Sequence, residues 1–132
     1  MNSSFVSRVT NEELANISKK FLDGGRYCLH KTLEDKLHVM LIHAVAGSEY
    51  LKHKHSDTNE FYVIIDGEMV VHCWDEFGRC ASIKMSTNIP SGIRTFSVEK
   101  NRWHSTLTGP NGATFFEFRS GPFDKENTIF EK

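Results

Sequence analysis

Two histidines and a glutamate lie close together in the sequence at spacings that suit metal binding. His53 and His55 are two residues apart, so on a β-strand both imidazoles leave the same face and can approach one ion. A polar turn over residues 56–59 follows, and an antiparallel return would place the carboxylate of Glu60 opposite them. An isolated His-x-His is more often only the polar edge of a strand. With Glu60 beside it, the pair predicts a site for one divalent metal ion, because imidazole and carboxylate are common ligands.

Glycines at fixed distances from these residues make the pattern more specific. Gly47, His53, His55, Glu60 and Gly67 occupy every fixed position of the first signature of the cupin superfamily, which this stretch resembles. The resemblance implies a double-stranded β-barrel, or jelly roll. It also implies that a further histidine, from a second signature on a later strand, completes the metal site.

Two later stretches compete for that second signature, which reads Pro-x-Gly-x-x-His-x-x-x-Asn. The stretch that starts at Pro90 keeps the turn residues but has Thr95 at the histidine position, and threonine is not a usual ligand. The other stretch keeps the histidine as His104 and replaces the glycine by Asn101, a residue that tolerates the left-handed conformation better than most. We therefore expect His104, and not Thr95, to be the fourth ligand.

A closer resemblance extends over nearly the whole chain, to the WbuC-type cupin-fold metalloproteins. The residues that carry it are Arg26, Leu29, His30, His53, Lys54, His55, Glu60, Phe61, Trp103, His104, Phe116, Glu117, Gly121 and Pro122. Genes of that family are associated with bacterial O-antigen and surface polysaccharide clusters. The resemblance implies a metal-binding cupin of about this size with a small-molecule role in polysaccharide assembly.

The hydrophobic pattern changes from helical to strand-like near Gly24. Thr10 and Glu13 have the spacing of a capping box, and apolar residues then recur at helical spacing up to residue 22. From residue 36 onward, apolar residues alternate with polar ones in many short segments, which indicates an all-β barrel or sandwich. We expect a short α-helix in an N-terminal extension over residues 1–25 and a cupin barrel over residues 26–132.

Turn residues divide the predicted barrel into strands. Asp66 and Gly67 separate two apolar segments and predict a two-residue hairpin turn. Residues 75–78 and 109–112 are rich in turn residues and predict two further breaks between strands.

Other polar residues could line a pocket beside the metal. Tyr62 shares a strand face with Glu60 and is a candidate catalytic acid or base, or else a packed residue with a satisfied hydroxyl. Glu117 and Arg119 alternate with two phenylalanines, so they lie on one polar face that lines a pocket or meets water. We take Tyr62 and Glu117 as candidate catalytic residues and Arg119 as a candidate substrate-binding residue.

Arg26 and His30 precede the barrel signature. A chain that crosses the barrel mouth could place them above the metal, where a guanidinium suits phosphate or carboxylate; the alternative is a surface pair. We take both as candidate substrate-binding residues. For the remaining histidines, His38, His43 and His72, we expect ordinary structural or exposed roles.

Composition excludes several other classes of protein. Lys plus Arg number 16 and Asp plus Glu number 17, so the chain has no net positive charge that would attract nucleic acid or an anionic membrane. No apolar run approaches the roughly 20 residues of a spanning helix, and the N-terminus has no export signal. Three cysteines without C-x-x-C spacing indicate reduced thiols. These features favour a cytoplasmic protein.

These residues lead to three hypotheses about function. The first is a metal-dependent isomerase or epimerase that acts on a sugar or sugar nucleotide in surface polysaccharide biosynthesis, with one divalent ion per chain (zinc, iron, manganese or nickel). The alternatives are an iron-dependent dioxygenase and a non-catalytic sensor that binds a sugar. We also expect a homodimer, formed through an apolar strand face that contains Phe61, Val63 and Ile65.

Overall fold

The computed structural model of the protein describes residues 10, 12 and 24–132. Its elements are β1 (Gly25–Cys28), β2 (Leu37–Ala44), β3 (Glu49–His55), β4 (Glu60–Trp74), β5 (Cys80–Ser86), β6 (Thr95–Val98), β7 (His104–Ser120), the 3-10 helix η1 (Lys125–Asn127) and β8 (Thr128–Phe130). The α-helix predicted for the N-terminal extension falls outside the described residues, apart from positions 10 and 12. No helix in the described part of the chain is long and apolar enough to cross a membrane.

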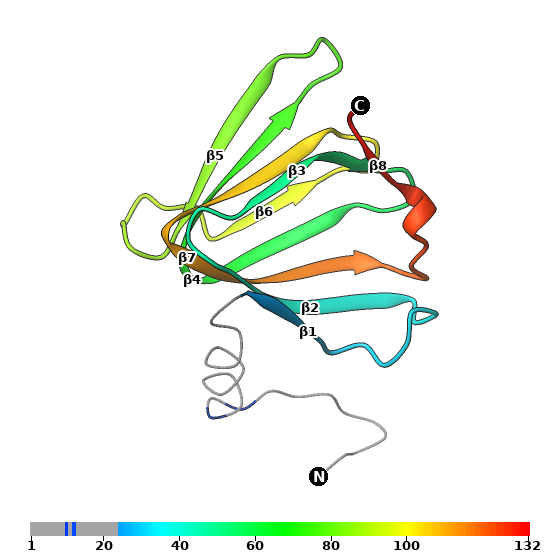
Figure 1. Cartoon of the computed structure of the whole chain (residues 1–132), viewed down its shortest axis with the longest axis horizontal. Helices are drawn as coiled ribbons and strands as arrows, with labels where there is room; N and C mark the ends of the chain where they lie inside the picture. The colour runs from blue at the N-terminus through cyan, green and yellow to red at the C-terminus, as the bar shows by residue number, and fades with distance from the viewer. Residues whose placement is uncertain (1–9, 11, 13–23) are drawn as a thin grey trace.

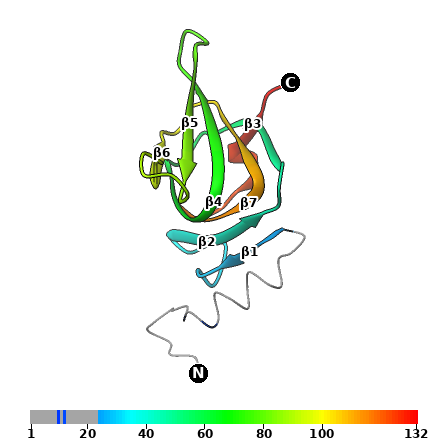
Figure 2. The same cartoon turned by 90° about the vertical axis from the view of Figure 1, so that its left-hand side faces the viewer.

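All ladders between the named strands are antiparallel, and two long strands organise them. β7 pairs with β2, β3 and β4, while β4 pairs with β5, β6 and β7. The strands curve around one another into a barrel, with the hairpin of β4 and β5 projecting from it (Figures 1 and 2). The predicted all-β barrel is confirmed.

Alternation along the strands separates the interior from the surface. On β4, Glu60, Tyr62 and Ile64 are buried, whereas Phe61, which lies between Glu60 and Tyr62, is 53% exposed. The buried apolar cluster comprises Tyr62, Ile64, Met69, Val71, Met85, Val98, Ala113 and Phe115. Burial of each large side chain contributes about 1.5–3 kcal/mol, so this core accounts for much of the stability of the barrel.

The predicted hairpin turn at Asp66 and Gly67 is wrong. β4 continues through both residues, and its ladder with β7 shifts register on either side of them. Gly67 has a φ of +87°, so its backbone freedom serves a bulge rather than a reversal of the chain. Pairing with β7 along both halves of β4 overrides the local turn preference.

The predicted break at residues 109–112 is also wrong in kind. β7 runs through these residues as one strand. Thr108 pairs with Met69 and Ala113 pairs with Gly67, so β7 has more residues than β4 over this stretch of the ladder. The extra residues of β7 therefore bulge out opposite the bulge of β4. The third predicted turn is confirmed, since the Asp75 N–H donates to the Arg79 carbonyl across it at 2.9 Å.

Candidate metal centre

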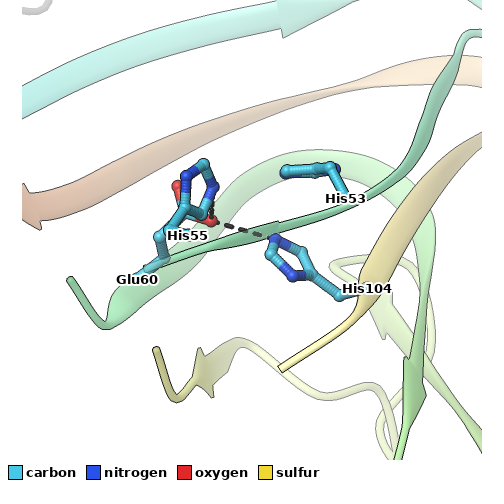
Figure 3. A group of neighbouring side chains, drawn as sticks. All are labelled: His53, His55, Glu60 and His104. Carbon is cyan, nitrogen blue, oxygen red and sulfur yellow. Dashed lines mark hydrogen bonds and ion pairs between the residues drawn. The ribbon is translucent and has the colours of Figure 1, made fainter. Parts of the chain in front are cut away.

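Four side chains that are scattered along the sequence meet inside the barrel. His53 and His55 come from β3, Glu60 is the first residue of β4, and His104 is the first residue of β7. One ligand atom from each lies within 4.8 Å of the others, and all four residues are buried (Figure 3). This set is the one expected from the two signatures.

The local backbone explains how His104 reaches the cluster. Asn101 has a φ of +63°, the left-handed conformation expected for the residue that replaces the signature glycine, and its N–H donates to the His55 carbonyl at 2.6 Å. Trp103 faces the other side, where the Nζ atom of Lys54 lies 4.7 Å from the ring centroid. Thr95 is exposed on β6 and pairs with Val63, so it is not part of the cluster.

Each histidine is oriented through the ring nitrogen that faces away from the cluster. Nδ1 of His53 lies 2.7 Å from the Leu51 carbonyl oxygen, Nδ1 of His104 lies 2.9 Å from the Arg102 carbonyl oxygen, and Nδ1 of His55 lies 3.1 Å from Oγ1 of Thr128. A carbonyl oxygen only accepts, so Nδ1 carries the hydrogen in His53 and His104. A neutral ring then presents the lone pair of Nε2 toward the centre, as in histidines that bind metal.

The contacts of Glu60 show that a cation fits among these atoms. Oε1 of Glu60 lies 2.9 Å from Nε2 of His55 and 3.0 Å from Nε2 of His104. Nε2 of His55 is buried and, apart from Glu60, has no hydrogen-bond partner among the described residues. Lone pairs of neutral imidazoles that converge on a carboxylate oxygen are stabilised by a positive ion between them, so the residues fit a divalent metal.

The protonation states suit the same ion. Burial, with a smaller contribution from His104, lowers the pKa of His53 to about 4, which keeps this ring neutral at pH 7. Burial alone would raise the pKa of Glu60, but close polar contacts with Glu117, His104 and His55 outweigh burial and hold the pKa well below its ordinary value. The cluster therefore offers an ionised carboxylate together with neutral imidazole.

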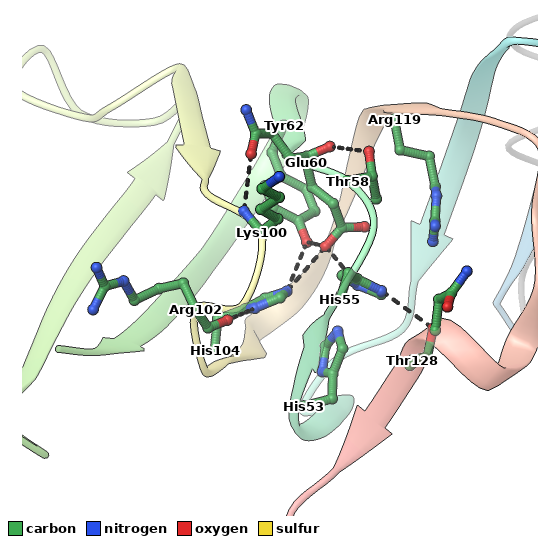
Figure 4. A network of polar contacts seen from close by, with 12 residues as sticks. His53, His55, Thr58, Glu60, Tyr62, Lys100, Arg102, His104, Arg119 and Thr128 are labelled. Carbon is green, nitrogen blue, oxygen red and sulfur yellow. Dashed lines mark hydrogen bonds and ion pairs between the residues drawn. The ribbon is translucent and has the colours of Figure 1, made fainter. Parts of the chain in front are cut away.

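Both candidate catalytic residues adjoin the cluster. The Tyr62 hydroxyl donates to Oε1 of Glu60 at 3.0 Å and lies 3.5 Å from Nε2 of His104 (Figure 4). Glu117 shares a hydrogen bond with Glu60, and burial together with the charge of Glu60 raises the pKa of Glu117 well above its ordinary value. Burial, followed by the charge of Glu60, likewise raises the pKa of Tyr62. Burial therefore favours the protonated form of both groups.

A cavity of about 400 Å³ opens onto three of the cluster residues, His53, His55 and Glu60. Its lining also includes all five residues predicted to act on a substrate: Arg26, His30, Tyr62, Glu117 and Arg119. His30 stacks on His38 with ring centroids 3.9 Å apart, and its Nδ1 accepts from the Val39 N–H at 3.2 Å. Arg26 is exposed, and its Nη1 lies 3.8 Å from Sδ of Met40. Their roles in binding stay predictions.

The cavity wall also contains residues that were not predicted as site residues, among them His38 and a segment near the C-terminus. His38 has a structural role as expected, since its Nε2 donates to the Leu33 carbonyl at 3.1 Å, but it is buried and also lines the cavity. The chain near the C-terminus closes another side with Phe123, Lys125, Thr128 and Phe130. β8 pairs there with β3, placing Thr128 opposite His55. A strand of three residues gives no recognisable periodicity in sequence.

The remaining predictions concern the outer face of the barrel and the cysteines. Phe61 is half-exposed on the outer face of β4, and Val63 and Ile65 are partly exposed beside it. The homodimer expected through this face stays a prediction. Cys28, Cys73 and Cys80 are all free thiols, as expected.

The barrel, the metal cluster within it and the cavity beside the cluster together define the cupin fold. Solved structures of this architecture include an oxalate decarboxylase of Bacillus subtilis, with 18% identity, a TM-score of 0.65 and coverage of 81% of this chain and 27% of that chain. KdgF from Halomonas sp. has 14% identity, a TM-score of 0.60 and coverage of 78% and 83%. An oxalate oxidase in complex with glycolate has 12% identity, a TM-score of 0.62 and coverage of 83% and 55%. The chain spans about a quarter of the oxalate decarboxylase, and these likenesses show the fold alone.

One family model matches part of the chain. A domain of unknown function, DUF6016, matches residues 25–85, which include His53, His55 and Glu60 but end before His104. No curated protein matches the sequence. The chain therefore has the cupin fold, with a three-histidine, one-glutamate cluster that fits one divalent metal ion.

Proposed function

We propose that this cupin is a metal-dependent enzyme that isomerises or epimerises a small polar carbohydrate derivative. The observation that carries the proposal is the cavity of about 400 Å³, in which a cluster fitted to a divalent ion lies beside two protonated groups, Tyr62 and Glu117. Cavities of a few hundred Å³ with a few convergent polar groups are typical of small-molecule sites.

The residues of the site have two roles, metal binding and proton transfer. His53, His55, Glu60 and His104 would hold the ion, which supplies Lewis acidity that polarises a carbonyl or hydroxyl oxygen. The protonated Glu117 can donate its proton to a substrate oxygen and, once ionised, accept one from the substrate. Such a shuttle needs no external oxidant or reductant, as isomerisation and epimerisation require.

The dimensions and charge of the cavity favour a compact polar ligand. A volume of about 400 Å³ suits a monosaccharide, whereas the nucleotide of a sugar nucleotide would extend past the mouth of the cavity. Arg26 is exposed at the cavity lining and offers a guanidinium for a phosphate there.

The biological setting rests on the resemblance to WbuC-type metalloproteins. That resemblance supports a role in O-antigen and surface polysaccharide biosynthesis, and we extend the proposal to a cytoplasmic homodimer. One oxalate decarboxylase of similar fold is described with Mn(II) centres, which supports manganese as one of the four candidate ions.

The test is a turnover assay on metal-loaded protein. Aldoses, uronic acids and sugar nucleotides are incubated in deuterium oxide and followed by proton NMR, with Glu117→Gln as the matched variant that lacks the acidic proton. Formation of an isomer without oxygen, lost in Glu117→Gln while metal content is retained, is the expected result. Oxygen uptake coupled to substrate loss would instead favour the dioxygenase. Tight binding without turnover would favour the sensor.

A further inference from the structure

Arg119 is a buried cation in the cavity wall that lacks a matching partner. Its exposed fraction is 4%, and its Nε atom is buried without a hydrogen bond from any described residue. Nη2 reaches the two carboxylate oxygens of Asp57 only at 3.4 and 3.5 Å. The ring centroid of Phe123 lies 5.1 Å from its Cζ atom. The hydrogen-bonding capacity of this guanidinium is therefore largely unused.

Arg119 lies next to the metal cluster in the sheet. Its Cα is the register partner of Glu60 on β4 and of His38 on β2. Directly opposed residues of an antiparallel pair have Cβ atoms about 5 Å apart on the same face. All three side chains line the same cavity, and Figure 4 shows Arg119 extending beside Glu60 toward the pair of His55 and Thr128. A ligand bound to this guanidinium therefore also lies beside the metal cluster.

The intramolecular partner of Arg119 is a weak one. The Asp57 side chain is 26% exposed, on the turn between β3 and β4, and its contacts are longer than those of a strong charge-assisted bond. Burial of a charged group is costly unless hydrogen bonds compensate for it. The fork of a guanidinium is satisfied best by a planar group with two oxygens, so the complementary ligand group is a carboxylate.

Arg26 differs from Arg119 in all these respects. It lies on β1 and is exposed, and its guanidinium contacts the sulfur of Met40. In the sheet it pairs with Ile42, which lies four residues along β2 from His38, the partner of Arg119. Arg26 therefore lacks the burial and the position beside the cluster that distinguish Arg119.

We propose that Arg119 binds a carboxylate of the ligand inside the cavity, so that the ligand is a small hydroxy acid whose hydroxyl groups face the metal cluster. The identification of this acid as a sugar acid rests on the function proposed above. The carboxylate site itself does not, because it follows from the burial, register and unused donors of Arg119.

Binding of matched probes tests the inference without relying on activity. Galacturonate, its neutral counterpart galactose and the simple hydroxy acid lactate are titrated calorimetrically into the full chain, both zinc-loaded and metal-free. Galacturonate should bind at least about tenfold more tightly than galactose, because a hydrogen bond to a charged group is among the strong ones. Arg119→Gln should remove this preference in both forms while leaving zinc content and galactose binding unchanged. Arg79→Gln, at an exposed arginine of the turn after β4 that does not line the cavity, should change galacturonate affinity less than about twofold.

Asp57→Asn provides a second variant that leaves Arg119 in place. Removal of the competing carboxylate should strengthen galacturonate and lactate binding several-fold, which tests the site even if Arg119→Gln fails to fold. Arg119→Lys should give an intermediate loss, since it keeps the charge without the fork.

The outcomes distinguish a failure of the carboxylate site from a failure of the carbohydrate proposal. Equal binding of galacturonate and galactose that is unaffected by Arg119→Gln would overturn the carboxylate site and leave the carbohydrate proposal standing. Lactate binding that depends on Arg119, with no binding of either sugar, would uphold the carboxylate site and overturn the carbohydrate proposal. Failure of every carboxylate probe to bind, in the wild type and in Asp57→Asn, would overturn the inference.

Discussion

Glu60 and His104 lie at opposite ends of one antiparallel ladder, yet Oε1 of Glu60 is 3.0 Å from Nε2 of His104. Glu60 pairs with Arg119 at one end of the β4 and β7 ladder, and His104 pairs with Cys73 at the other. A flat ladder of this length would separate the two residues by about 40 Å at about 3.3 Å per residue. The bend at Gly67 and residues 109–112 folds the ribbon back on itself, so the two bulges create the metal site.

Substitution of Gly67 should therefore damage both the fold and the site. A Cβ atom at Gly67 would lie 2.2 Å from the Gly112 carbonyl oxygen, and the φ of +87° is strained for any other residue. We expect Gly67→Ala to lower the free energy of unfolding by about 3 kcal/mol or more and to weaken metal binding. Gly78→Ala is the control, since its φ is +79° but its Cβ meets open space, and it should cost only about 1 kcal/mol. If urea unfolding gave equal decreases in the free energy of unfolding for the two variants, the close approach at Gly67 would be contradicted.

The assignment of the second signature can be tested by metal content. We expect about one ion per chain, and His53→Ala, His55→Ala or His104→Ala should each lower metal affinity by more than about 100-fold, since even outer partners of metal ligands contribute about 10-fold to 100-fold. Thr95→Ala should leave affinity unchanged because Thr95 is exposed on β6. Elemental analysis and competition with a chelator measure both quantities. Protein that stays empty after incubation with zinc, iron, manganese and nickel would contradict the metal site.

The metal cluster was predictable because its residues are identified by short-range spacing and by residue type in the sequence. The spacing of His53, His55 and Glu60 fixes which strand faces they occupy, and Asn101 marks the turn before His104 through its tolerance of positive φ. A periodicity of two likewise identifies the strands themselves. None of these features requires knowledge of how distant strands pair.

The bends and the closure of the cavity depend on long-range pairing and were not predictable in this way. Asp66 and Gly67 have the residue types of a hairpin, and only pairing with β7 on both sides keeps β4 continuous. Phe123, Thr128 and Phe130 line the cavity because β8 pairs with β3, some 73 residues away in sequence. Such a contact leaves no trace in the periodicity of a three-residue strand.

The Tyr62 hydroxyl should strengthen metal binding by orienting Glu60. It donates to Oε1 of Glu60 at 3.0 Å, and loss of such an outer contact lowers metal affinity by about tenfold or more. Tyr62→Phe should therefore show weaker zinc binding in a chelator competition, with the fold retained because the ring still fills the core. Tyr50→Phe is the matched control, as Tyr50 lines the same cavity and packs its ring edge-on against His53 with centroids 4.7 Å apart. A similar loss in both variants would rule out the specific role of Tyr62.

The expected dimer can be tested at the outer face of β4. Phe61 is 53% exposed there, and a partner copy would bury this apolar surface. Phe61→Lys should shift the protein from dimer to monomer in light scattering coupled to gel filtration. Phe77→Lys, at the even more exposed Phe77 of the turn after β4, should not change the mass. A wild-type protein that is monomeric at micromolar concentration would refute this prediction.

Acid should destabilise the metal-free protein through His53. The pKa of His53 is about 4 in the folded chain, against about 6.5 for an unperturbed histidine, because burial penalises the charged ring. As the pH falls from about 6.5 toward 4, the unfolded chain gains a proton at His53 that the folded chain does not bind, so the free energy of unfolding decreases over this range. His53→Gln cannot take up this proton and should show a shallower decrease. Urea unfolding of both metal-free proteins at pH 7.5, 6 and 5 measures the difference, and parallel pH profiles would show that His53 is not buried in its neutral form.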